Sequence, residues 1–68
     1  MNIEWEPDFT IRVTNDNGEI VISANRDGLL SLTKQLAALA DETPGSHIHY
    51  DEHNSLEDGS AQLIIVKE

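Results

Sequence analysis

Apolar and polar side chains alternate in two neighbouring stretches near the start of the chain, residues 9–14 and 19–24. A period of two residues is typical of a half-buried β-strand, because successive side chains point to opposite faces. The apolar positions are Phe9, Ile11 and Val13 in the first stretch, and Ile20, Ile22 and Ala24 in the second. The alternation therefore predicts two strands, each with one face toward a core.

The segment between these strands, Asn15-Asp16-Asn17-Gly18, is a strong hairpin signal. Asn and Gly accept the positive φ that tight hairpin turns require. A two-residue loop pairs Val13 with Ile22, and a four-residue loop pairs Val13 with Ile20; both keep apolar side chains together. A three-residue loop would put the faces out of phase unless a bulge corrected it. The sequence leaves the two even loop lengths, or a bulged loop, open.

Upstream of the first strand, Ile3 and Trp5 alternate with Glu4 and Glu6. This alternation predicts that the strand begins early. Pro7 interrupts it, and proline is tolerated in sheets only at edges and bulges. We therefore expect an edge strand that is kinked or bulged at Pro7.

A longer period follows, in which leucines recur every three or four residues, as in an amphipathic helix with one apolar stripe. The expected stripe consists of Leu29, Leu32, Leu36 and Leu39, flanked by Thr33 and Ala40. The face expected toward water holds Ser31, Lys34, Gln35 and Ala38. Asn25 or Asp27 can cap the first turn, because a short side-chain oxygen accepts from its unpaired amides. Thr43-Pro44-Gly45 ends the helix after about Asp41.

Two further strands are predicted after the helix, over Ser46–Asp51 and Ala61–Lys67, on either side of a long polar and acidic loop. One helix stripe covers only one face of a four-stranded sheet. We therefore expect a single two-layer α+β domain over residues 1–68. It has an antiparallel sheet of about four strands with one helix on one face, in the order ββαββ.

The other face of that sheet is expected to be open and partly apolar, with Val21, Ile64 and Val66 on it. A domain this small leaves such a face wet only at a cost in stability. This favours a homodimer or another homo-oligomer built on this face, which is a structural role distinct from any enzyme activity.

Composition narrows the possible partners. The chain has 68 residues, no cysteine and a net charge of −9. Without cysteine there is no disulfide and no thiolate metal site, and the excess of acid argues against nucleic acid and anionic membrane as partners. Met1-Asn2-Ile3-Glu4 lacks the basic and apolar regions of a signal peptide, so a cytoplasmic location is expected.

The stretch from Asp51 to Asp58, at the start of the long loop, carries four acidic residues with no Lys or Arg between them. One interpretation is a solvated loop. The other is a docking surface for a basic protein, where opposite charge raises the association rate. The predicted partner-binding residues are His49, Asp51, Glu52, His53, Asn54, Glu57 and Asp58.

Three histidines raise a separate hypothesis. His47, His49 and Asp51 lie two residues apart, on one face of a strand, and His53 follows in the loop. Three such ligands and a water would suit an open zinc site, as in a zinc-binding protein or hydrolase. The spacing matches no named zinc motif, and a polar or partner-facing surface is the commoner role. We expect no cofactor and no enzyme activity, since so short a chain has little material for a cleft that excludes water.

Three segments resemble the immunity protein 32 family of bacterial polymorphic toxin systems over about residues 19–67. They are Asp27-Gly28-Leu29-Leu30-Ser31-Leu32, Ser46-His47-Ile48-His49-Tyr50-Asp51, and Asn54-Ser55-Leu56-Glu57-Asp58-Gly59-Ser60 followed by Gln62-Leu63-Ile64-Ile65. The resemblance implies a small α+β protein that binds and neutralises a cognate toxin and has no activity of its own. The residues carried over from this match, with no individual role assigned, are His49, Asp51, Asn54, Leu56, Glu57 and Gly59.

Overall fold

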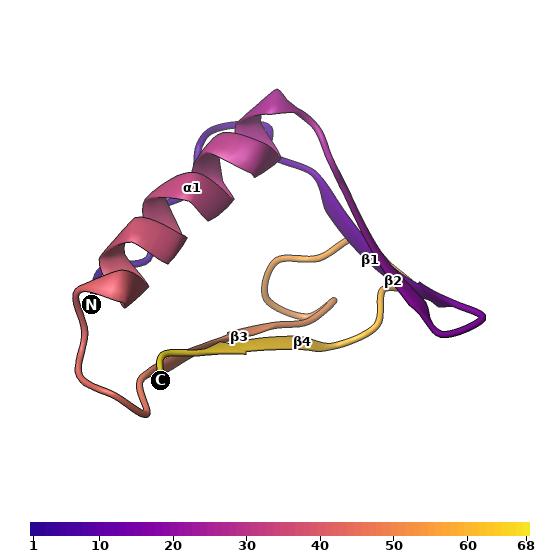
Figure 1. The fold of residues 1–68 in the computed structure, drawn as a ribbon. Coiled ribbons are helices and arrows are strands. Elements are labelled where there is room, and N and C mark those ends of the chain that lie inside the picture. Colours follow the sequence, from indigo (N-terminus) through magenta and orange to yellow (C-terminus); the bar gives the residue numbers. More distant parts are fainter.

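The computed structural model describes residues 1–68. Four strands and one helix follow each other in the predicted ββαββ order, which confirms the α+β class. They are β1 (Ile11–Asp16), β2 (Glu19–Ala24), α1 (Arg26–Ala40), β3 (His47–Tyr50) and β4 (Leu63–Val66). The helix and the two strand pairs form three sides of a triangle in Figure 1.

The β1–β2 hairpin has the shorter of the two even loops. Val13 pairs with Ile22, and Asp16 pairs with Glu19 across the two-residue turn. Both turn residues have positive φ, 52° at Asn17 and 88° at Gly18. Asn and Gly tolerate that conformation, so the turn sequence fixes the register of the pair.

The four strands form two separate antiparallel pairs, β1–β2 and β3–β4, where one continuous sheet was expected. The edge of β1 that a third strand would need is already occupied. The amides of Glu57 and Ala61 donate to the carbonyl oxygens of Ile11 and Val13, at 2.9 and 2.8 Å. The long loop thus takes the place of a strand beside β1 and divides the sheet.

The core lies between the helix and the two strand pairs. Its buried members come from both pairs, from the helix and from the long loop. They are Ile11, Val13, Leu39, Ile48, Tyr50 and Leu56. Only nine of the 68 residues are buried, which agrees with the limited core of so short a chain.

The expected early strand is absent, because residues 1–10 form no strand and turn at Pro7-Asp8. This segment instead lies against the helix. The amide of Glu6 donates to the Ser31 hydroxyl oxygen at 2.8 Å, and the Gln35 side-chain amide donates to the Glu4 carbonyl at 2.7 Å. Helix side chains, not a neighbouring strand, satisfy this stretch of backbone.

This contact explains why the predicted helix face was wrong. Ser31 and Gln35, expected in water, are buried, whereas Leu29 and Leu36 are 54% and 42% exposed. Thr33 and Ala40, expected beside the buried stripe, are also exposed. The N-terminal segment covers the polar face of α1 and rotates the buried stripe toward Ser31, Gln35 and Leu39.

Asn25 is the N-cap of α1, one of the two predicted candidates. Its side-chain oxygen accepts from the amide of Gly28 at 2.7 Å and from that of Thr10 at 3.0 Å. At the other end, Asp41 is the C-cap, and the Lys67 ammonium donates to the Ala40 carbonyl. A cation there offsets the negative end of the helix dipole.

A pair of alanine substitutions tests the rotated face. We expect Gln35→Ala to lower the free energy of unfolding by about 1–3 kcal/mol, because it leaves the Glu4 carbonyl and the buried Tyr50 hydroxyl without partners. Leu36→Ala, at the neighbouring exposed position, should change it by no more than about 0.5 kcal/mol. Urea unfolding measures both. A larger loss of stability for Leu36→Ala than for Gln35→Ala would support the predicted leucine stripe as the buried face.

Gly28 allows the helix to approach β1 closely. A Cβ atom at this position would lie 2.4 Å from the Thr10 carbonyl oxygen, a backbone atom that cannot turn aside. We expect Gly28→Ala to destabilise the protein by about 1–3 kcal/mol through overpacking, although alanine is the better helix former. Thr33→Ala, at an exposed position of α1, is the control and should not destabilise. A higher melting temperature for Gly28→Ala would refute the close approach.

Candidate docking surface

The long loop is folded by the carboxylate and the carbonyl of Asp51. One carboxylate oxygen accepts from the amides of His53 and Asn54, at 2.9 and 3.0 Å. The carbonyl oxygen accepts from the amides of Ser55 and Leu56, at 3.0 and 2.8 Å. Asp side chains commonly organise turns in this way. Asp51 therefore has a structural role in the loop whatever else it contacts.

The second half of the loop is held by contacts to distant residues. Glu52 accepts from the amide of Gly59 at 2.8 Å, and the Arg12 guanidinium on β1 donates to the Asp58 carbonyl at 2.8 Å. Leu56, between them, is 5% exposed and belongs to the core. The loop is thus a packed part of the fold, which lowers the entropy cost of presenting it to a partner.

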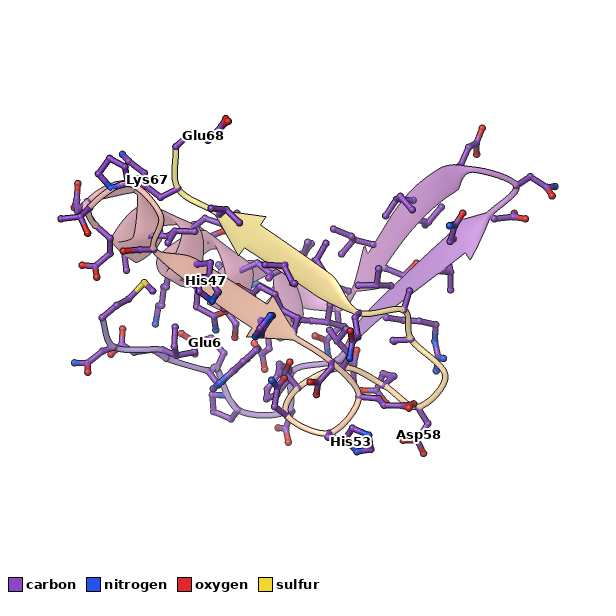
Figure 2. All side chains as sticks on the ribbon, turned by 90° about the horizontal axis from the view of Figure 1, so that it is seen from below. Glu6, His47, His53, Asp58, Lys67 and Glu68 are labelled. Atoms are coloured by element: carbon purple, nitrogen blue, oxygen red, sulfur yellow. The ribbon has the colours of Figure 1, made fainter.

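Of the four acids in the loop, Glu57 and Asp58 have carboxylates with no hydrogen bond or ion pair within the chain. Figure 2 shows Asp58 and His53 at the outer side of the loop, at the opposite end of the view from Lys67 and Glu68. Of the two acidic residues, Asp58 is exposed and Glu57 is half-buried.

A shallow cavity of about 310 Å³ adjoins the loop. It lies between the N-terminal segment and β3. Its lining comprises Met1, Ile3, Trp5, His47, Ile48, His49 and Asn54. Asn54 joins cavity and loop, because its side-chain amide donates to the His49 carbonyl at 3.2 Å. The predicted residues His49 and Asn54 therefore lie at one continuous surface with the acidic loop.

The N-terminal wall of this cavity was not predicted. Trp5 stacks on Phe9 with ring centroids 4.3 Å apart, and it meets the Tyr50 ring edge-on at 6.3 Å. These aromatic contacts fix the wall in place. Sequence alone could not show it, since the path of residues 1–9 depends on hydrogen bonds to the helix rather than on strand pairing.

The zinc hypothesis gains no support from the arrangement of its residues. The rings of His47 and His49 are 5.3 Å apart between centroids, and His47 also contacts the Gly45 carbonyl at 3.2 Å. Asp51 turns to the loop amides, including that of His53. No group of three or more His, Asp or Glu side chains is arranged to hold a metal ion.

The expected oligomer face is divided between the two strand pairs. Val21, Ile64 and Val66 are 41%, 51% and 53% exposed, so all three are available to a partner. Val21 lies on β2, however, and the other two lie on β4, in the separate pair. Because the sheet is divided, these side chains do not form one open face.

The fold and this surface define a small α+β domain with a shallow cavity beside an acidic loop. The family model for immunity protein 32 matches residues 19–68, and the chain belongs to this family. Comparison with curated proteins and with solved structures found no match. The helix α1 has neither the length nor the hydrophobicity needed to cross a membrane.

The buried Tyr50, against which the cavity residue Trp5 packs, gives a testable pH dependence. Burial raises the pKa of the Tyr50 phenol above its ordinary value of 10.0, and the hydroxyl donates to Gln35 at 2.8 Å. Above pH 10 the unfolded chain loses this proton while the folded chain keeps it, so stability should fall as the pH rises.

We therefore expect the free energy of unfolding to decrease as the pH rises above about 10, and Tyr50→Phe to reduce that decrease. Trp5, the single tryptophan, reports unfolding by its fluorescence. An equal pH dependence in both proteins would show that Tyr50 is not its source.

Proposed function

We propose that this protein is an immunity protein that binds and neutralises a cognate bacterial toxin through the cavity and the acidic loop. Membership of the immunity protein 32 family supports the immunity role. The geometry supports this choice of site, because a cavity lined partly by apolar side chains adjoins a loop that has carboxylates without a partner in the chain. The protein acts by binding, with no catalytic step, in the cytoplasm.

The distribution of charge favours a basic partner. Of the four basic side chains, Lys34 forms an ion pair with Glu6, Lys67 bonds to a helix carbonyl and Arg12 bonds to the loop. These four cations offset only part of the charge of the thirteen acids, and the net charge is −9. Such a field steers a basic protein toward the surface and speeds encounter.

The cavity can hold a side chain of the partner, which the acidic residues of the loop cannot do. Binding energy is concentrated in a few side chains that fill well-packed pockets. Trp5 and Ile3 offer apolar contact, and His49 and Asn54 offer hydrogen bonds at the border of the loop. A toxin segment with a long basic or aromatic side chain suits this combination, with its apolar stem in the cavity and its polar end toward the side of the loop that Asn54 occupies.

The toxin encoded beside this gene is the partner to test. We expect the two purified proteins to form a complex at micromolar concentration, and co-expression to relieve the toxicity. Absence of both effects would contradict the immunity function.

The position of the site is tested by charge reversal. The double variant Glu57→Lys/Asp58→Lys should weaken binding at least about tenfold, mainly through a slower association rate that depends on salt. The control, Asp41→Lys/Glu68→Lys, makes the same change in net charge away from the loop and should retain most of the affinity. If both variants bind equally weakly, net charge rather than this surface determines affinity. If neither loses affinity, the toxin binds elsewhere.

A further inference from the structure

The outer edge of β2 is open along its whole length. β2 pairs with β1 alone, and five of its six residues are exposed. Three consecutive apolar side chains, Ile20, Val21 and Ile22, are 58%, 41% and 45% exposed. Figure 1 shows the hairpin extending away from the rest of the molecule. An exposed apolar edge strand invites pairing with another strand.

The register determines which backbone groups of β2 are free. Residues that flank a two-residue turn exchange both of their hydrogen bonds, so pairing alternates from Asp16–Glu19 to Thr14–Val21. The N–H and C=O groups of Ile20 and Ile22 therefore point away from β1. The same alternation frees the carbonyls of Ile11 and Val13 on β1.

The loop confirms this alternation, because its amides donate to those two β1 carbonyls. The outer edge of β1 is thus filled and the outer edge of β2 is not. β2 also lacks the usual protection of an edge strand, since it contains no Pro or Lys and pairs without a bulge.

We propose that the occupant of this edge is β2 of a second copy of the chain, antiparallel, with a two-fold axis at Val21. In this register Ile20 lies opposite Ile22 of the second copy, and their outward backbone groups bond to each other. Val21 lies opposite Val21 of the second copy. The two hairpins then form a four-stranded sheet in which all three exposed apolar positions face apolar partners.

Charge complementarity identifies the second copy as the occupant. Glu19 stands at the turn end of this edge, with Asp16 beside it on β1, and Arg26 follows the other end of β2. None of these three side chains has a partner within the chain. A two-fold axis at Val21 brings Arg26 of each copy to the acidic end of the other. A basic strand from a toxin would attract the acidic residues at one end of the edge, but its positive charges would repel Arg26 at the other end.

A single cysteine tests the register, since the chain has no other. In the proposed register, Val21 and Val21 of the second copy form a non-hydrogen-bonded pair. The Cα atoms of such a pair are about 4.5 Å apart, a distance that a disulfide can bridge. We expect Val21→Cys to form a covalent dimer readily under mild oxidation. Val66→Cys, at a somewhat more exposed position on β4, is the control: this variant should still dimerise through β2 but should remain largely without a cross-link. Equal cross-linking of both variants, or of neither, would overturn the proposal.

Charge reversal gives a second measurement that needs no cross-link. Sedimentation should show a dimer for the natural chain and a weaker one for Arg26→Glu, with the dissociation constant raised about three- to tenfold. Glu19→Arg added to Arg26→Glu should restore the dimer. A monomer at all concentrations, or no restoration, would overturn the proposal.

These measurements use only this chain, so they stand apart from the proposed toxin binding. If the natural chain is monomeric and Ile22→Lys abolishes toxin binding, the toxin rather than a second copy occupies the edge, and the proposal fails.

Discussion

The rest of the structure depends on the two hydrogen bonds made by the buried side chain of Gln35. Its oxygen accepts from the Tyr50 hydroxyl, and its nitrogen donates to the Glu4 carbonyl, so one side chain joins β3, α1 and the N-terminal segment. A buried polar side chain is tolerated only when its hydrogen bonds are satisfied. Here the requirement sets the rotation of the helix, the path of residues 1–9 and, through Trp5, one wall of the cavity.

The long loop has a second organising role, because it supplies both core and backbone pairing. Leu56 fills the core, and the amides of Glu57 and Ala61 occupy the edge of β1. The acids of the loop therefore lie on a segment that a buried leucine holds in place. Substitutions at Leu56 or Arg12 would alter the presentation of the acidic surface without removing a charge from the acids.

The sequence predicted what depends on local rules. The Asn17-Gly18 turn, the Asn25 cap and the ββαββ order follow from φ preferences, capping chemistry and periodicity. Three features escaped it because they depend on contacts distant in sequence. Gln35 is buried by a segment about thirty residues away, the sheet is divided by loop amides, and the cavity needs the N-terminal wall. Within the site, His49 and Asn54 were predicted but their cavity was not.

The N-terminal wall of the cavity lies outside the part of the chain that matches the family. The family match begins at residue 19, whereas Met1, Ile3 and Trp5 of the cavity lie before it. A chain that keeps residues 19–68 but changes its first nine would retain the helix, the loop and the β3–β4 pair while presenting a different cavity. The cavity wall and the acidic loop therefore come from separate parts of the chain, so the shape of the cavity can change while the loop keeps its sequence.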